Sequence, residues 1–419
     1  PGMTYATTVQ AIYVGGISSG ESTSVNTVIL ATPNAPTAPT VTLLAADSVR
    51  LSWTAPATDA TRAAVTGYVV EVTPTTGVVL PESIGASIRN ITLTGLTPGL
   101  SYSFRVKAVS VVGDSDFTGF SDSMVMPNAP QDVQAVQTGA TTATVNWTGS
   151  TGTVDSYKIT ATPAVGKVVT VTAKVPATSA TLTGLVAGST YDISVVANYG
   201  RIPSAASTST SLLVTYAPAP PVLTEIRLIT TTKALLTWTP SVADATKAAV
   251  TAYEITSKPL PADALPISGA NDTTAMVTGL ASGTSYTMSL RANSITGYST
   301  ASNSLTLVAP AVPTSVAAKV TGLAATVSWK APKGTVTGYH IVTTDNVFGL
   351  VSDVTVAGNA TSVTVNDLSA ASNYSIAVSA IFGDVESGTV SVAAATLNVP
   401  NAPTAATSAL ATETSAKIS

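Results

Sequence analysis

Apolar and polar residues alternate with a period of two along much of the chain. After Tyr102, for example, single polar residues separate the apolar side chains of Phe104, Val106 and Ala108. Period two over this length predicts a β-strand with one buried face. Similar segments rich in Val, Ile and Thr recur between turn residues, and no apolar face is spaced at three and four residues over a helical length. The chain is therefore predicted to be all-β.

One pattern of aromatic residues occurs four times. Tryptophans recur at intervals of 94, 91 and 91 residues, and each is followed by a tyrosine, then by a leucine that precedes a second tyrosine by six residues. A repeat of roughly ninety residues is typical of a small sandwich domain. We predict that these side chains form the structural core of each copy: Trp53, Trp147, Trp238, Trp329, Tyr68, Tyr157, Tyr253, Tyr339, Leu96, Leu185, Leu280, Leu368, Tyr102, Tyr191, Tyr286 and Tyr374.

The second tyrosine of each copy is predicted to lie at a corner between strands. Three of the four copies have a glycine three residues before it, at Gly99, Gly188 and Gly283, where freedom in φ favours a tight turn. A tyrosine at such a corner can bury its ring and still bond its hydroxyl group to the nearby backbone. The tryptophans keep one register on their strands, so we expect them in the core rather than on a sugar-binding surface.

This combination resembles the fibronectin type III family. The Trp of the second strand, the Tyr of the third and the Leu-to-Tyr corner before the sixth all match, four times over. The resemblance implies tandem seven-stranded antiparallel β-sandwiches of immunoglobulin-like type, arranged end to end because an odd number of strands enters at one pole and leaves at the other. It also suggests a prokaryotic secreted or surface protein, because many bacterial members lack cysteine and this chain has none.

Proline-rich segments such as PNAPTAP at 33–39 separate the copies, and proline favours extended backbone there. The first residues, PGMTY, match PGLSY at 98–102, so we expect the chain to begin within a module; the last residues approach the position of a fifth tryptophan. The expected organisation is 1–32 as the C-terminal part of a module, then module 1 (33–127), module 2 (128–217), module 3 (218–309), module 4 (310–399), and 400–419 as the N-terminal part of the next.

A second period lies over the first. The spacing from Trp to the next Tyr is 15, 10, 15 and 10 residues, and the longer loops carry DATRAAVT (59–66) and DATKAAVT (244–251). The genetic unit is therefore expected to be a pair of modules. One hypothesis is that the long loops pack at alternate joints or touch a neighbouring chain; the other is neutral variation copied by duplication.

Charged residues make up 10% of the chain, against about 25% in ordinary soluble proteins. The net charge of −4 gives no basic patch for nucleic acid or for an anionic membrane surface. No apolar run approaches the ~20 residues of a membrane span. Low net charge weakens repulsion between copies. The expected partners are copies of the same protein or neighbouring modules, or else a surface polysaccharide or a host or cell-surface protein.

Candidate chemistry is sparse. His340 is the only histidine and follows Tyr339, which places it on the opposite, solvated face of the strand. Without a second histidine or a cysteine we expect no catalytic or zinc site, and no cofactor. Asp114, Asp116 and Asp122 in GDSDFTGFSD could hold calcium, although their spacing does not match the EF-hand loop; an Asx-rich turn is the alternative.

Five aromatic residues lie near the loops that follow the sixth strands: Tyr199, Tyr298, Phe117, Phe120 and Phe382. Exposed rings could stack on sugars or on partner proteins. The alternative, which we favour, is that they fold back over the edge of their own module.

The pattern as a whole predicts a non-catalytic, extracellular or cell-surface structural repeat protein that forms a stiff rod, fibre, sheath or surface lattice. The alternatives are a spacer or adhesive stalk, or a carbohydrate-binding accessory region of a larger secreted enzyme or adhesin.

Overall fold

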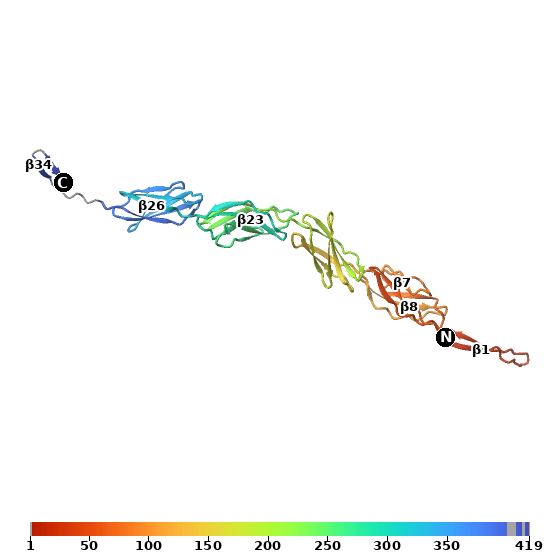
Figure 1. Ribbon diagram of the computed structural model, residues 1–419. Helices are drawn as coiled ribbons and strands as arrows, with labels where there is room; N and C mark the ends of the chain where they lie inside the picture. The colour runs from red at the N-terminus through yellow and green to blue at the C-terminus, as the bar shows by residue number, and fades with distance from the viewer. Residues whose placement is uncertain (1, 400–407, 413–414, 419) are drawn as a thin grey trace. The chain divides into compact units, whose positions relative to one another are not determined.

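The computed structural model describes residues 2–399, 408–412 and 415–418, which form antiparallel β-sheets joined by turns (Figure 1). Across these residues the secondary structure is entirely β, which confirms the predicted class. Within the same ranges, no helix has the length and hydropathy needed to cross a membrane. The chain divides into two units, residues 1–215 and 216–419.

The first unit holds a hairpin and modules 1 and 2. The hairpin pairs β1 (Met3–Thr7) with β2 (Val25–Ile29). In module 1 the sheets are β3 (Thr40–Ala45), β4 (Ser48–Ser52) and β7 (Asn90–Leu93), and β6 (Ile84–Gly85), β5 (Gly67–Thr73), β8 (Ser101–Val109) and β9 (Met124–Val125). In module 2 they are β10 (Gln131–Gln137), β11 (Thr142–Thr148) and β14 (Ser179–Thr183), and β13 (Val169–Lys174), β12 (Ser156–Pro163), β15 (Thr190–Tyr199), β16 (Ile202–Pro203) and β17 (Thr210–Leu213).

The second unit repeats the plan. Module 3 contains β18 (Val222–Thr230), β19 (Lys233–Thr239) and β22 (Thr274–Val277), and β21 (Ile267–Gly269), β20 (Val250–Lys258), β23 (Ser285–Ser294), β24 (Gly297–Tyr298) and β25 (Leu305–Val308). Module 4 contains β26 (Thr314–Thr321), β27 (Ala324–Lys330) and β30 (Ser362–Val365), and β29 (Gly349–Ala357), β28 (Gly338–Asp345), β31 (Asn373–Phe382), β32 (Val385–Glu386) and β33 (Val390–Ala395). A last hairpin pairs β34 (Ser408–Thr412) with β35 (Ser415–Ile418).

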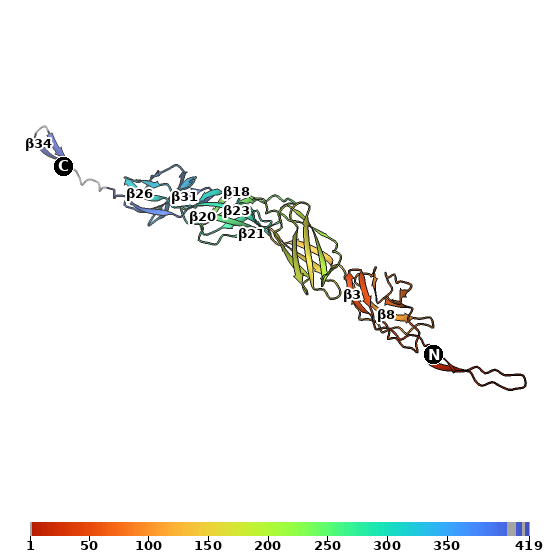
Figure 2. The same cartoon turned by 45° about the vertical axis from the view of Figure 1, so that its right-hand side comes forward.

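Every module is thus a two-layer sandwich with the same strand order. Three strands form one sheet and four form the other, with the seventh strand broken into two pieces in modules 2 to 4. β3 and β8, both labelled in Figure 2, belong to the two different sheets of module 1. All paired strands are antiparallel, so the predicted seven-stranded antiparallel sandwich in tandem is confirmed.

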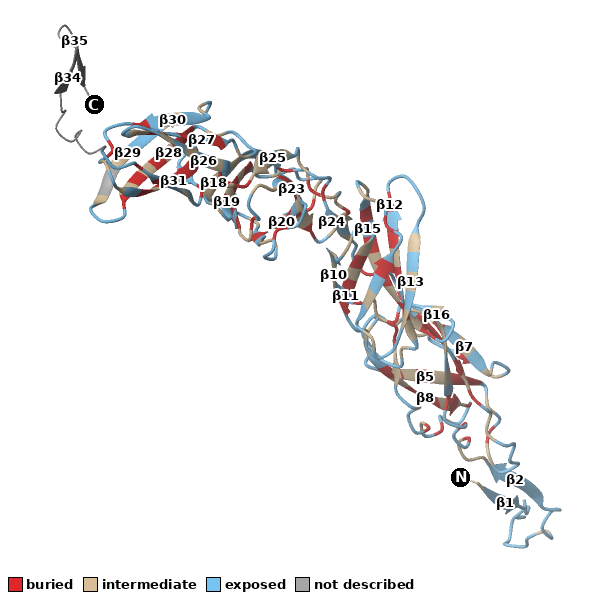
Figure 3. Cartoon of the chain, turned by 60° about the vertical axis from the view of Figure 1, so that its left-hand side comes forward, coloured by how far each residue is buried: buried red, intermediate tan, exposed pale blue. Residues whose placement is uncertain are grey.

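The sixteen predicted core side chains all lie between the sheets, and none is more than 5% exposed. In each module the Trp of the first sheet meets the first Tyr of the second sheet, with ring centroids 4.9–5.5 Å apart. Buried positions, red in Figure 3, alternate with more exposed ones along β12 and β15. Truncating one such Trp to Ala should cost roughly 3–5 kcal/mol.

The corner tyrosines make the same hydrogen bond in all four modules. The hydroxyl oxygen accepts from the backbone N–H five residues earlier, over 2.7–3.1 Å. The residue three before the tyrosine has a positive φ, of 83° at Gly99 and 59° at Ala371. The left-handed turn carries the chain round the corner and directs the N–H toward the ring, so module 4 achieves without glycine what the other modules achieve with it.

The other tyrosine differs between modules, and a proline explains why. In modules 2 and 3 its hydroxyl oxygen accepts from the N–H three residues after the Trp, Ser150 or Ser241, over 3.0 and 3.1 Å. In module 1 that position is Pro56, which has no N–H. The buried Tyr68 hydroxyl has no hydrogen-bond partner among the described residues, and burial raises its pKa.

The seventh strand begins as a series of hydroxyl-mediated rungs rather than as a regular ladder. Ser115 donates its N–H to Ala108 O, and its Oγ accepts from Ala108 N, both over 2.8 Å. Thr118 and Ser121 repeat this two and four residues back along β8. The start of the seventh strand thus advances three residues for every two residues of β8. The same rungs occur at Ser204, Ser207, Ser299, Ser302 and Ser387.

These rungs interrupt the edge of the larger sheet. A segment that runs out of step with its neighbour offers no evenly spaced row of N–H and C=O groups to another strand. Module 1 has three rungs, modules 2 and 3 have two each, and module 4 has one. The regular part of the strand is correspondingly shortest at β9 and longest at β33.

Because Pro56 stands in module 1 where module 2 has Ser150, the two tyrosines that face them provide a matched pair of substitutions. Tyr157→Phe leaves the Ser150 N–H without its acceptor and should destabilise module 2 by about 0.5–1.5 kcal/mol. Tyr68→Phe removes a hydroxyl that has no such donor to satisfy, so module 1 should change by less than about 0.5 kcal/mol. Denaturant titration of the whole chain, read by hydrogen exchange of β11 and β4, measures both. Equal losses in the two variants would contradict the explanation.

Candidate functional site

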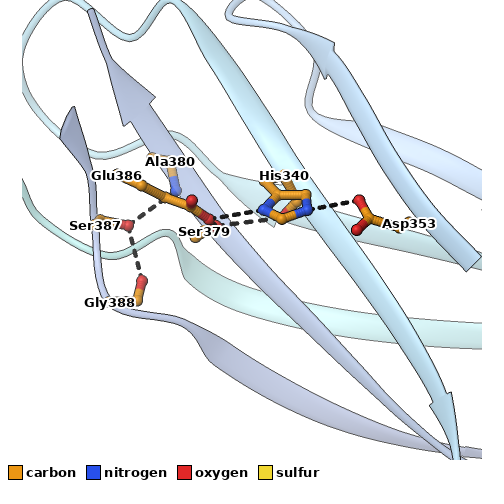
Figure 4. A network of polar contacts seen from close by, with 7 residues as sticks. All are labelled: His340, Asp353, Ser379, Ala380, Glu386, Ser387 and Gly388. Atoms are coloured by element: carbon orange, nitrogen blue, oxygen red, sulfur yellow. Dashed lines mark hydrogen bonds and ion pairs between the residues drawn. The ribbon is translucent and has the colours of Figure 1, made fainter. Parts of the chain in front are cut away.

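A connected polar group on the described surface surrounds His340 on β28. Its Nδ1 lies 2.9 Å from Glu386 Oε1 and its Nε2 lies 2.6 Å from Asp353 Oδ1 (Figure 4). Asp353 comes from β29 and Glu386 from β32, so the imidazole links three strands of the larger sheet. The His340 side chain is 27% exposed and lies on the outer face, as its position after Tyr339 predicts.

Ser379 completes the group from β31. Its position faces His340 in the strand register, and its hydroxyl donates to Glu386. A Ser–His relay needs an imidazole nitrogen free to take the serine proton. Here both nitrogens face carboxylates and the serine hydroxyl is bonded to Glu386. The arrangement therefore fixes the imidazole of His340 between two carboxylates and does not activate the Ser379 hydroxyl as a nucleophile.

His340 and Glu386 shift each other's pKa in opposite directions. The hydrogen bond that His340 donates to Glu386, and then the one it donates to Asp353, raises the pKa of His340, although partial burial opposes the change. The Ser379 hydroxyl, and then His340, lowers the pKa of Glu386. The two carboxylates therefore extend the pH range over which the imidazolium is favoured, relative to a free histidine.

Equivalent positions on the outer faces of modules 1 and 3 carry other ion pairs. In module 3, Glu254 bonds Arg291 over 3.1 Å, and the guanidinium carbon lies 3.8 Å from the centre of the Tyr298 ring. In module 1, Lys107 pairs with Asp114 over 2.8 Å. The strand register aligns these residues with His340, Ser379 and Glu386.

Module 1 adds a second charged group beside that row. Arg105 reaches Glu71 through two bonds of 2.8 and 2.9 Å, and its guanidinium carbon lies 4.5 and 4.7 Å from the ring centres of Phe117 and Phe120. These two rings cover a cation of their own module, although Phe120 stays 43% exposed.

Of the three remaining aromatic candidates, two are buried and one is partly exposed. Tyr199 and Phe382 are buried at the edge of their modules, and the Tyr199 hydroxyl donates to Thr151 O over 2.6 Å. Tyr298 packs on Arg291 and stays 46% exposed. All five rings thus contact their own module.

The calcium candidates Asp114, Asp116 and Asp122 are exposed, and Asp114 is held by Lys107. Across residues 2–399, 408–412 and 415–418, no group of three or more His, Cys, Asp or Glu side chains is placed to hold a metal ion. Calcium binding by this loop stays a prediction.

A family model for the fibronectin type III domain matches residues 34–121, 128–212, 218–308 and 311–393. The chain belongs to the fibronectin type III family. Among curated proteins it is 32% identical to human tenascin-R over 213 residues and 28% identical to mouse tenascin over 347 residues. These matches cover 50% and 81% of this chain, but only 15% and 16% of the relatives.

A third relative is the chicken receptor-type tyrosine-protein phosphatase eta, 30% identical over 200 residues, which are 47% of this chain and 13% of that protein. The chain therefore spans less than a fifth of the length of each of these relatives. All three come from vertebrates; a prokaryotic source for this chain stays a prediction.

The long loops of fibronectin type III modules 1 and 3 hold the residue that lies two positions before each module. In the first unit, Ala31 accepts from the Ala63 N–H over 2.8 Å and donates to Thr61 O over 3.0 Å, as a short parallel bridge. In the second unit, Tyr216 makes the equivalent bonds with Ala248 and Thr246, over 2.8 and 2.9 Å. These bonds lie within one unit in each case, and the hypothesis that the loops pack at alternate joints stays a prediction.

The joints of the short-loop modules are built differently. In the first unit, Asn128 Oδ1 accepts from Thr151 N over 2.8 Å, and Leu43 of module 1 packs on the core of module 2. In the second unit, Leu228 of module 3 packs in the same way on the core of module 4. Side-chain packing replaces the parallel bridge.

A pocket lies under each long loop, of about 350 Å³ in module 1 and 690 Å³ in module 3. Equivalent residues line the two pockets. Pro33 and Tyr68 in module 1 correspond to Pro218 and Tyr253 in module 3, with the prolines at the joints and the tyrosines on the third strands. Their walls are rich in alanine and proline.

Sequence reasoning missed the carboxylates around His340. The available signal was the repeat itself. Glu386 directly precedes the buried Ser387, as Asp114 precedes Ser115 and Tyr298 precedes Ser299. Aligning the modules on these serines brings Glu386 beside the third and sixth strands.

The His340 group predicts a pH-dependent contribution to module 4. The pKa is raised on folding, so the stabilisation is complete below the unfolded value of about 6.5 and is lost as the pH rises through the folded value. For a partly exposed group the loss should be about 0.2–1 kcal/mol. Hydrogen exchange of β28 in the whole chain, corrected for intrinsic rates, measures it.

In His340→Gln this alkaline loss should disappear. Lys158→Gln alters the equivalent position of module 2, where Lys158 forms no ion pair with any described residue, and should leave module 4 unaffected. Because the pKa of Glu386 is lowered, its own contribution is lost instead as the pH falls. An unchanged alkaline loss in His340→Gln would exclude the imidazole as its source.

Proposed function

We propose that this chain is a non-catalytic segment of an extracellular or cell-surface structural protein. Its fibronectin type III modules would act as a stiff connecting array, in a rod, fibre, sheath or surface lattice. The observation that carries the proposal is the pair of main-chain hydrogen bonds between each long loop and the residue two positions before its module. A joint fixed by backbone bonds resists bending more than a Gly/Ser tether would.

The named relatives support the general class. Tenascin-R, tenascin and a receptor-type phosphatase match this chain over 213, 347 and 200 residues. The small share of each relative that is matched makes the role of any whole protein part of the proposal. A spacer or adhesive stalk is the second candidate, and it draws on the same joints.

The polar groups support a non-catalytic role. His340, the only histidine in the sequence, is held between Asp353 and Glu386, and the described aromatic candidates pack on their own modules. The 10% content of charged residues argues against nucleic acid as a partner. Copies of the protein itself, a surface polysaccharide or a host or cell-surface protein remain the proposed partners.

The location and the assembly can be tested together. Antibodies against modules 1 to 4 should label intact, unpermeabilised source cells or the material around them. Electron microscopy of the labelled material should show regular fibres, sheaths or lattices. Labelling only after permeabilisation would refute the proposal, and surface labelling without a regular assembly would favour the stalk.

The joint in front of module 3 provides a sharper prediction. Ala248 is buried where its N–H meets Tyr216, whereas its neighbour Ala249 is exposed. Ala248→Asp should open this joint, because a buried carboxylate without a partner is unfavourable. We expect faster cleavage by chymotrypsin after Tyr216, whose backbone the loop holds, and a broader distribution of distances in small-angle scattering.

Ala249→Asp has the same charge change and serves as the control. It should leave both measurements unchanged. Far-UV circular dichroism checks that the modules remain folded in both variants. If the two variants behave alike, the joint does not depend on the buried contact.

A further inference from the structure

Strand β29 of module 4 is an open sheet edge. It is nine residues long and pairs only with β28, at one end of the sheet order β29–β28–β31; a bulge at position 351 leaves the six residues 352–357 in regular register. None of the other described strands runs along its outer side. An edge of this length presents a row of unpaired backbone N–H and C=O groups.

The other edges of the four modules are short or flanked. The equivalent strands β6 and β21 have two and three residues. Strand β13 has six, but β14 lies beside it. The seventh strands are interrupted by hydroxyl rungs, and β17, β25 and β33 lie beside the first strands of their modules. Strand β3 is flanked by β16. The fifth strands of the modules, β7, β14, β22 and β30, have four or five residues.

The side chains of β29 suit pairing with another strand. Val354 faces the buried Ile341 in the register, yet it is 37% exposed because β30 does not lie alongside. The described charge on this strand, Asp353, is tied back to His340. The strand contains no proline or lysine, the residues that commonly protect sheet edges. Figure 3 shows β29 at the margin of module 4.

We propose that β29 pairs antiparallel with β29 of a second copy of this chain, so that two module 4 sheets become one continuous sheet. A register centred on Val354 sets Asp353 of each copy opposite Thr355 of the other, and no two carboxylates face one another directly. The added strand covers the exposed part of Val354 and supplies partners for the free backbone groups.

The placement of charge on β29 suits a second copy as the occupant. In this register Asp353 of each strand keeps its bond to His340 of its own module and lies opposite the uncharged Thr355, so no like charges face one another directly. The isologous arrangement uses one surface twice, as closed dimers of identical chains commonly do.

The β29 contact rests on the proposed structural role and would join two copies within the assembly. Its failure would leave the extracellular location and the stiffness of the joints intact, because those are measured by cell labelling and by the Ala248 and Ala249 variants.

The experiment compares Val354→Lys with Val171→Lys in the whole chain. Val171 has the equivalent register in module 2, opposite Ile159, but lies on the flanked strand β13. An inward-pointing lysine on an open edge should block strand addition and can extend to solvent at a partly exposed site. Sedimentation equilibrium from micromolar to high micromolar concentration measures self-association.

The wild-type chain and Val171→Lys should dimerise, and Val354→Lys should bind itself at least about tenfold more weakly. Hydrogen exchange should show protection of 349–357 that increases with protein concentration in the first two only. A wild-type chain that stays monomeric, or a dimer that survives in Val354→Lys, would overturn the proposal. Thermal unfolding of each variant confirms that module 4 is folded.

Discussion

The contact between one indole and one phenol across the two sheets is the constraint on which each module depends. Trp147 comes from the smaller sheet and Tyr157 from the larger, and their ring centres lie 5.2 Å apart. Their packing sets where the sheets can approach and which register buries the apolar side chains. A one-residue slip of either strand would turn these rings to solvent, so the alternation along the remaining strands must follow.

The residues around that contact vary because several arrangements preserve it. A donor on Ser150 or Ser241 satisfies the tyrosine hydroxyl in two modules, while Pro56 removes the donor in module 1. The ring stays buried in either case, because burial of its apolar area outweighs one neutral hydrogen bond. The core thus tolerates a change in polar detail but not a change in shape.

The outer face and the joints carry the differences between modules. Glu254 with Arg291, Lys107 with Asp114, and His340 with its carboxylates occupy corresponding places on the sheet. These side chains face water, where an ion pair contributes little to stability and the residues can change without loss of the fold. Surface charge and edge length are therefore where modules of one fold can acquire different partners.

The sequence by itself determined the fold class, the repeat and the sixteen core positions, because period-two burial and an aromatic register are local patterns that survive in one dimension. It also marked the long loops, although their bonds to Ala31 and Tyr216 appear only when the chain is folded. The group around His340 and the open edge of β29 were decided by tertiary structure alone. Asp353 and Glu386 lie 13 and 46 residues from the histidine, and only strand pairing brings them to it.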